Sequence, residues 1–139
     1  MQTEKSAGVI VFRQEKKERK YLLLHYEEGH WDFVKGKMEK NETEIQTLVR
    51  EANEEAGLKD LELIDGFKEK ISYFFKRNEE LVSKEVIFYL AKTHLAKIML
   101  SNEHIGYKWV SFENALRQLT YKNAQELLKT AESFLRGRD

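Results

Sequence analysis

Glu51, Glu54 and Glu55 are placed so that their carboxylates could do chemistry together. Residues three and four apart on a helix project from neighbouring points of one side, so a helix here would bring the three carboxylates toward one point. Like charges at this spacing repel each other by a few tenths of a kcal/mol for each pair. A divalent cation such as Mg²⁺ or Mn²⁺ prefers hard oxygen ligands and would turn this repulsion into binding energy. A metal held in this way suits the hydrolysis of phosphates.

The alternative is a solvated charged face, which is the commoner role of an acidic helix. The helix itself is indicated between Asn41 and Gly57. Asn41 is a candidate N-cap with Glu44 at capping-box spacing, and Gly57 is well placed to end the helix. One apolar face is expected to point inward, and it consists of Ile45, Leu48, Val49, Ala52 and Ala56.

Strands and two further helices are predicted around this helix. Residues 7–12 and 21–26 are apolar runs that indicate a buried hairpin. Long alternating segments at 61–75 and 83–93 predict two strands joined by a polar turn at 76–81, and 107–110 predicts a short strand. Ser111 is expected to cap a short helix over 112–119. The last helix is expected over 122–135, with an inward face of Leu127, Leu128, Ala131, Phe134 and Leu135. This order favours an α/β domain with a mixed sheet between helices.

Composition narrows the function classes. The 139 residues fit a single domain over 1–139, with no boundary or repeat. The 24 basic and 24 acidic side chains balance, so a broad basic surface for nonspecific nucleic-acid binding is not indicated. There is no cysteine, which excludes disulfides, a cysteine nucleophile and thiolate metal sites. No apolar run is long enough to span a membrane and no signal-peptide pattern opens the chain, so a cytoplasmic protein is expected.

The segment from Gly36 to Leu58 resembles the Nudix box, G-x5-E-x7-R-E-U-x-E-E-x-G-U, where U is apolar. All fixed positions are filled, although Ala52 is smaller than the usual aliphatic residue. They are Gly36, Glu42, Arg50, Glu51, Ala52, Glu54, Glu55, Gly57 and Leu58. The resemblance to Nudix hydrolases implies an α/β/α sandwich in which the box forms a loop, a helix and a loop. It also implies that Arg50 and Glu42 brace the helix and orient the glutamates.

The same resemblance implies a metal site for Mg²⁺ or Mn²⁺. Glu51, Glu54 and Glu55 match the family's metal ligands, and the carbonyl of Lys35 is a further candidate. Glu103 matches an acid that reaches the metal cluster from outside the box in related enzymes. One of the three glutamates, or an acid from a later loop, would be the general base, and the family varies in which one it is.

Three further stretches resemble the asymmetrical diadenosine tetraphosphate hydrolases of the animal and archaeal type. They are residues 29–37, residues 66–75 with 84–91, and residues 101–115. The resemblance implies hydrolysis of a small-molecule dinucleoside polyphosphate to ATP and AMP, with no obligate protein partner. Such a substrate needs cations for its phosphates and aromatic rings for its bases. By resemblance, the cations are His30, Lys35 and Lys84, and the rings that sandwich an adenine are Tyr73 and Tyr121.

Each of these residues could also have a purely structural role. Tyr73 could be a half-buried strand residue, Tyr121 could pack the start of the last helix, and His30 could be a turn residue. Lys84 and Glu103 could be solvated surface charges. Other Nudix reactions stay open as well, namely pyrophosphate removal from RNA 5′ ends or from damaged nucleoside triphosphates. A non-catalytic nucleotide-binding module is a further alternative, but such modules usually lack box glutamates that are present here.

Overall fold

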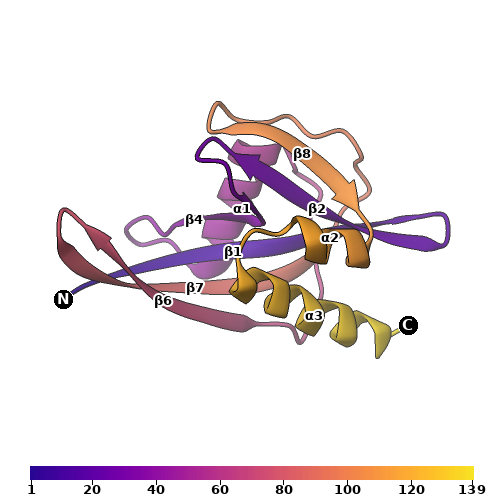
Figure 1. The fold of residues 1–139 in the computed structure, drawn as a ribbon. Coiled ribbons are helices and arrows are strands. Elements are labelled where there is room, and N and C mark those ends of the chain that lie inside the picture. The colour runs from indigo at the N-terminus through magenta and orange to yellow at the C-terminus, as the bar shows by residue number, and fades with distance from the viewer.

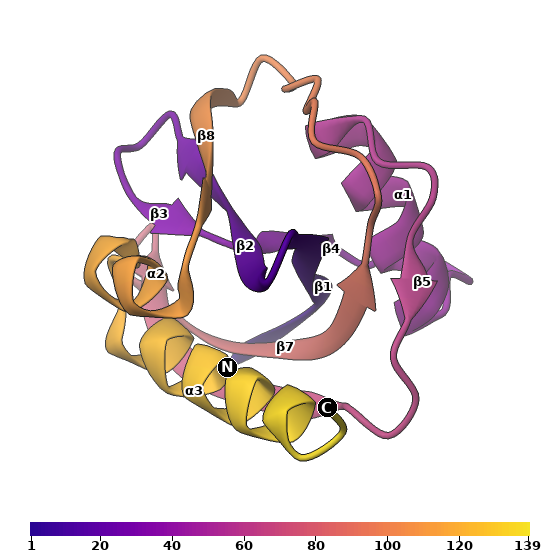
Figure 2. The same cartoon turned by 90° about the vertical axis from the view of Figure 1, so that its right-hand side faces the viewer.

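The computed structural model describes residues 1–139. Its strands are β1 (Gln2–Glu15), β2 (Glu18–Tyr26), β3 (Trp31–Asp32), β4 (Val34–Lys37), β5 (Glu62–Leu63), β6 (Glu69–Arg77), β7 (Glu80–Lys92) and β8 (His104–Val110). Its helices are α1 (Glu44–Ala56), α2 (Phe112–Gln118) and α3 (Lys122–Arg136). The strands form one mixed sheet in the order β3-β2-β1-β7-β5, with β4 on β1, β6 on β7 and β8 on β2. Helix α1 lies on one side of this sheet, and α2 and α3 lie on the other (Figures 1 and 2). The predicted α/β/α arrangement is confirmed.

Strand β1 is the centre of the sheet and is buried on both faces. It pairs antiparallel with β2 and β4 and parallel with β7, where Gln2 lies opposite Val82 and Phe12 opposite Lys92. Alternate residues of a strand point to opposite faces. Ile10 therefore packs in the core beneath α3, whereas Val9 packs in the core beneath α1. This double burial explains why the sequence of β1 is a continuous apolar run rather than an alternating one.

The apolar face of α1 is narrower than predicted. Leu48, Ala52 and Ala56 are fully buried, as expected, but the side chains of Ile45 and Val49 are 42% and 49% exposed. The buried face is turned toward the polar residues Thr47 and Glu55 instead, which are 0% and 5% exposed. Thr47 donates a hydrogen bond from its hydroxyl to Glu42 at 2.7 Å, which holds the helix in this orientation.

The N-cap of α1 is Thr43, so the prediction of Asn41 was wrong. The Thr43 hydroxyl accepts from the backbone N–H of Gln46, and the Gln46 side chain accepts from the Thr43 backbone N–H, which completes a capping box. Asn41 lies before the helix with φ 67°. Glu44 does not fold back onto the cap because Lys5 and Tyr89 bind its carboxylate at 2.9 and 2.8 Å. Gly57 ends the helix in the left-handed conformation, as predicted.

The predicted strands have different bounds in the structure, and those expected over 7–12, 21–26 and 83–93 run over 2–15, 18–26 and 80–92. The single strand expected over 61–75 is split into β5 and β6, and Gly66 between them has φ 92°, which breaks the pairing. Asn78 and Glu79 both have positive φ and form the tight turn between β6 and β7, a conformation that matches the twist of a hairpin. Strand β8 begins at His104, three residues earlier than expected.

The two C-terminal helices follow the predictions closely. The Ser111 hydroxyl accepts from the Asn114 backbone N–H and caps α2, as expected. In α3, the predicted inward residues Leu127, Leu128, Ala131 and Leu135 are buried, and Phe134 is half-buried against the same core. None of the three helices combines the length and apolarity needed to cross a membrane.

Candidate active site

Gly36 on β4 allows the side chain of Glu51 to lie directly against the strand. A Cβ atom at position 36 would lie 2.1 Å from Glu51 Cδ and 2.3 Å from Glu51 Oε1. These distances are shorter than any real side-chain contact, so only glycine leaves room for this carboxylate. The site therefore depends on the close approach of α1 to β4, two elements that both belong to the box.

Arg50 holds the acidic side chains of α1 in place with a fork of hydrogen bonds. Its Nε and Nη2 bind the two oxygens of Glu42 at 2.7 and 3.0 Å. Its Nη1 binds Glu51 Oε1 at 2.7 Å and Glu54 Oε2 at 3.3 Å. Nη2 also donates to the carbonyl of Lys37 at 3.1 Å, which ties the helix to the end of β4. A planar five-donor guanidinium can make all these bonds at once, and a lysine could not.

Glu42 acts as the counter-charge for Arg50. The hydrogen bond from Arg50, joined by those from the Glu39 backbone and the Thr47 hydroxyl, lowers the pKa of Glu42 to about 2. The same carboxylate raises the pKa of Arg50. The predicted bracing pair is therefore formed in the structure, and Arg50 reaches both Glu51 and Glu54 as well.

Glu51, Glu54 and Glu55 lie in different environments, although the sequence suggests three equivalent acids. The side chain of Glu54 is 58% exposed, and that of Glu51 is 14% exposed. Glu55 is 5% exposed. Burial raises the pKa of Glu55 well above its usual range, and the neighbouring carboxylate of Glu51 adds to this shift. The most buried acid of the three is therefore the one that most needs a compensating positive charge.

His104, which the sequence did not single out, closes the inner side of this cluster. Its Nε2 lies 3.6 Å from Glu55 Oε1, and both atoms are buried without a hydrogen-bond partner. Burial lowers the pKa of His104 and raises that of Glu55, so it disfavours the charged form of both groups. Its Nδ1 lies 2.9 Å from the Ser101 hydroxyl. No motif marks this histidine, because its role depends on the contact between the first residue of β8 and Glu55 of α1.

The residues at this end of α1 fit a divalent metal. The donors are carboxylate oxygens, Gly36 lets the carboxylate of Glu51 lie against β4, and a buried oxygen of Glu55 lacks a partner. In the structure, however, no three Asp, Glu or His side chains converge into a preassembled metal site. Arg50 instead binds oxygens of Glu51 and Glu54.

Glu103 lies exposed at the rim of the acidic cluster rather than inside it. Its carboxylate is close enough to raise the pKa of Glu55, and its backbone carbonyl accepts from the Glu27 N–H at 3.0 Å. A shallow hollow there is lined by Glu27, Glu28, Glu103 and Tyr26. Glu27 and Glu28 were not predicted, and the acidic surface next to the box is therefore wider than the motif alone indicates.

A cavity of about 470 Å³ lies next to the acidic cluster, on the α3 side of the sheet. This volume is within the range of small-molecule sites. Four predicted substrate residues line it together, although they come from distant parts of the chain, and these are His30, Lys35, Tyr73 and Tyr121. The cavity also contains Asp32 and Asn123, and Ile71, Val86 and Phe88 form its apolar floor.

Hydrogen bonds between β3 and the start of α3 hold the two sides of this cavity together. The Trp31 N–H donates to the Thr120 hydroxyl at 2.8 Å, and the Thr120 N–H donates to the Trp31 carbonyl at 3.3 Å. These bonds place the rings of His30 and Tyr121 with centroids 5.5 Å apart. Tyr121 is 48% exposed and makes no side-chain cap for α3, so its ring is available to a ligand.

Tyr26 connects the cavity to the acidic cluster. Its ring stacks on His30 with centroids 4.6 Å apart and meets His104 edge-on at 4.4 Å. Lys35 is held on the cavity side by a 3.0 Å ion pair with the buried carboxylate of Asp32. Tyr26 was not predicted because its contact with His104 depends on the pairing of β2 with β8. Asp32 was not predicted either, although Lys35 lies only three residues further along the chain.

Lys84 is the one predicted substrate residue that does not line the cavity. It lies on β7, directly opposite Tyr73 of β6 and opposite Glu4 of β1. It is half-buried, and burial lowers its pKa, with repulsion from nearby cations adding to the effect. Its position is therefore beside the cavity, further along the same face of the sheet.

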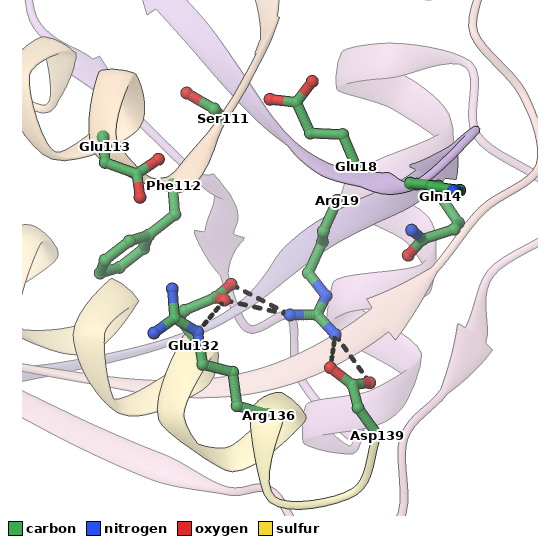
Figure 3. Close-up of a pocket in the computed structure, with 10 residues that line it drawn as sticks. Gln14, Glu18, Arg19, Ser111, Phe112, Glu113, Glu132, Arg136 and Asp139 are labelled. Atoms are coloured by element: carbon green, nitrogen blue, oxygen red, sulfur yellow. Dashed lines mark hydrogen bonds and ion pairs between the residues drawn. The ribbon is translucent and has the colours of Figure 1, made fainter.

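A second hollow, of about 430 Å³, lies at the other end of α3 and is lined almost entirely by polar side chains (Figure 3). Arg19 is at its centre and bonds to Glu132 at 3.1 Å and to Asp139 at 2.7 Å. Glu132 also accepts from the Tyr21 hydroxyl at 2.6 Å and from Arg136 at 2.7 Å. Arg19, Glu132, Arg136 and Asp139 are joined by these bonds, so the centre of this hollow is a structural ion-pair network that fastens α3 to β2.

Comparison with known proteins agrees with the geometry. The family model of the NUDIX domain matches residues 2–131. The chain is 31% identical over 143 residues to an asymmetrical bis(5′-nucleosyl)-tetraphosphatase of Sus scrofa, covering 94% of this chain and 95% of that one. An RNA pyrophosphohydrolase of Nitratiruptor sp. is 28% identical over 116 residues, covering 75% of this chain and 73% of that one. The solved Caenorhabditis elegans Ap4A hydrolase binary complex superposes with a TM-score of 0.82 at 27% identity, covering 96% and 98% of the two chains.

Proposed function

This chain belongs to the NUDIX domain family and is a Nudix hydrolase, and from this premise we propose that it cleaves diadenosine tetraphosphate to ATP and AMP. The observation that carries the proposal is the cavity in which His30, Lys35, Tyr73 and Tyr121 come together beside the acidic helix. It combines two aromatic rings for a base with cationic or hydrogen-bonding groups for phosphates. The relatives named as tetraphosphatases agree with this substrate class.

Nudix hydrolases generally need a divalent metal, and we propose Mg²⁺ or Mn²⁺ for this one. Glu51, Glu54 and Glu55 would hold the ion, with the carbonyl of Lys35 and the rim acid Glu103 as further ligands. A bound metal would shield the phosphate charges and make a coordinated water more acidic. Gly36 makes room for the Glu51 carboxylate against β4, and Arg50 fixes the direction of the carboxylates.

The side chains of the cavity would orient the substrate. An adenine would lie between Tyr73 and Tyr121, while Lys35 and His30 bind phosphate oxygens next to the acidic cluster. Asp32 would keep the Lys35 ammonium on the cavity side through their ion pair. In the reaction, water oxygen bonds to a phosphorus and one bridging P–O bond breaks. One product gains the hydroxyl of the water, and a proton of the water is released or taken up by the leaving phosphate.

The proposal is tested by chromatography of the products that the purified protein forms from diadenosine tetraphosphate with Mg²⁺. We expect ATP and AMP in equal amounts, formed faster than products from 5′-triphosphorylated RNA or from nucleoside triphosphates. Labelled water would show which phosphorus is attacked, because the label enters either ATP or AMP. An intact dinucleotide beside rapid turnover of another substrate would refute the proposed substrate and leave the Nudix chemistry in place.

Removal of pyrophosphate from RNA 5′ ends is a second candidate. It is favoured by the relatives named as RNA pyrophosphohydrolases, at 28% identity in Nitratiruptor sp.. A single RNA 5′ nucleotide could use the same ring pair, because stacking accepts any base. The same product assay separates the two candidates.

A further inference from the structure

The face of the sheet that forms the floor of the cavity continues toward the tip of the β6–β7 hairpin. Along β6, alternate residues share a face, so Tyr73, Phe75 and Arg77 point to the same side. Figure 1 shows that this hairpin extends past the N-terminal end of α3, which therefore does not cover its outer part. The strip of these three side chains, which we call the β6 strip, begins at the cavity and leads away from it.

The β6 strip is built from groups on which nucleobases stack. The rings of Tyr73 and Phe75 have centroids 6.4 Å apart. The guanidinium of Arg77 lies over the Phe75 ring, 5.2 Å from its centroid. Aromatic rings and arginine guanidinium groups are the usual platforms for bases in single-stranded nucleic acids and nucleotides. Phe75 therefore offers a second stacking position beyond the one at Tyr73.

An excess of positive charge lies beside the β6 strip. Glu4 is 6% exposed and is the single carboxylate that binds both Arg77, at 3.0 Å, and Lys37, at 3.3 Å. Lys84 lies directly opposite Glu4 in the sheet but forms no ion pair with it. A second carboxylate, the exposed Glu80, lies opposite Arg77 at the tip of the hairpin. Arg77, Lys37 and Lys84 still outnumber Glu4 and Glu80, and the remaining positive charge favours an anionic ligand at this place.

A continuous series of contacts joins this charged region to the acidic helix. Arg50, which binds Glu51, also donates to the carbonyl of Lys37, and the Lys37 ammonium in turn binds Glu4. Glu4 is bonded to Arg77 at the end of the β6 strip. A phosphate chain that leaves the acidic helix would therefore meet Lys37 first and then Arg77, whose guanidinium lies over Phe75.

We propose that the β6 strip, with Lys37 and Lys84 beside it, binds the second nucleotide of a dinucleoside polyphosphate. This inference rests on the proposed function and adds the position of the distal half of the substrate. The first base lies between Tyr73 and Tyr121, the phosphates pass the acidic helix, and the chain bends back so that the second base stacks on Phe75.

The test replaces Phe75 by leucine, which keeps an apolar side chain in the strand but removes the ring. Phe74→Leu is the matched control, because Phe74 is the adjacent residue of β6, points to the opposite face and is 63% exposed. Two ligands are compared. Diadenosine tetraphosphate has both nucleosides, and adenosine 5′-tetraphosphate has the same number of phosphates but lacks the second nucleoside.

We expect Phe75→Leu to raise the KM for the dinucleotide about fivefold or more, which corresponds to the loss of one stacked base. The inhibition constant of adenosine 5′-tetraphosphate against the same reaction should stay within about twofold. Arg77→Lys, which keeps the charge and removes the planar group, should behave like Phe75→Leu. Phe74→Leu should change neither value. Melting temperatures close to that of the unmodified protein would confirm that the variants are folded.

Three results would overturn the inference. The first is an unchanged KM in Phe75→Leu, and the second is an equal loss for both ligands, since the strip would then act on the shared half of the substrate. The third is an effect confined to 5′-triphosphorylated RNA, which would assign the strip to a different ligand. Failure of the unmodified protein to cleave diadenosine tetraphosphate would instead refute the proposed function itself, and the inference with it.

Discussion

Replacing Gly36 by alanine should remove most of the activity while leaving the fold intact. The added Cβ would lie 2.1 Å from Glu51 Cδ, whereas ordinary van der Waals contact begins at 3.4 Å. The carboxyl carbon must therefore retreat by the difference, roughly 1.3 Å. Glu51 Cγ, at 2.5 Å, is also too close, so rotation of the carboxylate alone does not relieve the clash and the whole side chain must move.

The expected changes in kcat and in the free energy of unfolding follow from this displacement. A misplacement of about 1 Å in an active site costs on the order of 100-fold in rate, so kcat should fall by about that factor. The backbone at position 36 is not left-handed, and alanine at a compatible position stabilises a protein by about 0.4–1 kcal/mol. The weakened bond between Glu51 and Arg50 costs about 1 kcal/mol in the other direction. The free energy of unfolding should therefore change by less than about 1 kcal/mol.

The assay is steady-state hydrolysis of diadenosine tetraphosphate, together with thermal and urea unfolding. Gly106→Ala is the control, because a Cβ at that strand glycine would have its nearest neighbour, His25 Cβ, at 3.8 Å. It should keep full activity. In a Glu51→Gln background, Gly36→Ala should add little further loss, since both changes act on the same carboxylate. A kcat within threefold of the unmodified protein, or an additive loss in the double variant, would refute the reasoning.

Other parts of the structure lead to three further expectations. Arg50→Lys should lower kcat by about 10- to 100-fold, because lysine cannot make the forked bonds to the glutamates. It should also raise the pKa of Glu42, which NMR titration would detect, and an unchanged pKa of Glu42 would contradict this role of Arg50. Burial alone would raise the pKa of Glu132, but its bonds to Tyr21, Arg136 and Arg19 outweigh burial, and the pKa is lowered. The ionised carboxylate therefore stabilises the fold fully above the unfolded-state pKa of about 4.3, and this stabilisation is lost as the pH falls through the lower folded-state pKa. Glu132→Gln should therefore reduce the free energy of unfolding by about 3 kcal/mol at pH 7, and urea titrations should show the difference narrowing below about pH 4; a difference independent of pH would refute the role assigned to these ion pairs. Thr43→Ala should cost about 1 kcal/mol by the same measurement, whereas Asn41→Gly should cost almost nothing, and the reverse order would restore Asn41 as the cap.

The sequence predicted which helices and strands form better than it predicted the residues at which they begin and end. The central run at 7–12 identified the strand buried on both faces, because a short uninterrupted apolar stretch rich in β-branched residues is typical of such a strand. The cap of α1 was assigned wrongly because Asn41 with Glu44 and Thr43 with Gln46 have the same spacing. Only tertiary contacts distinguish them, since Lys5 and Tyr89 engage Glu44.

For the candidate site, helical spacing and resemblance contributed different parts. The spacing of Glu51, Glu54 and Glu55 predicted an acidic cluster on one side of the helix, whereas the contact between Arg50 and Glu42, which the structure contains, was expected from the resemblance to the Nudix box. The meeting of Tyr73 and Tyr121 in one cavity was expected only by resemblance, since 47 intervening residues carry no local signal for it. His104 and the different burial of Glu54 and Glu55 could not be predicted, because they depend on the tertiary contact between the start of β8 and α1.

The parallel pairing of β1 with β7 has a consequence for folding during synthesis on the ribosome. Every residue of β1 from Gln2 to Phe12 finds its β7 partner eighty positions later in the chain. At a synthesis rate of about 5–20 residues per second, the edge of β1 that pairs with β7 stays unpaired for roughly 4–16 s. Hairpin pairing with β2 can form at once, but the open edge is a template for pairing with other chains during that time. Yield of folded protein should therefore respond to translation speed and to chaperones that cover nascent strands.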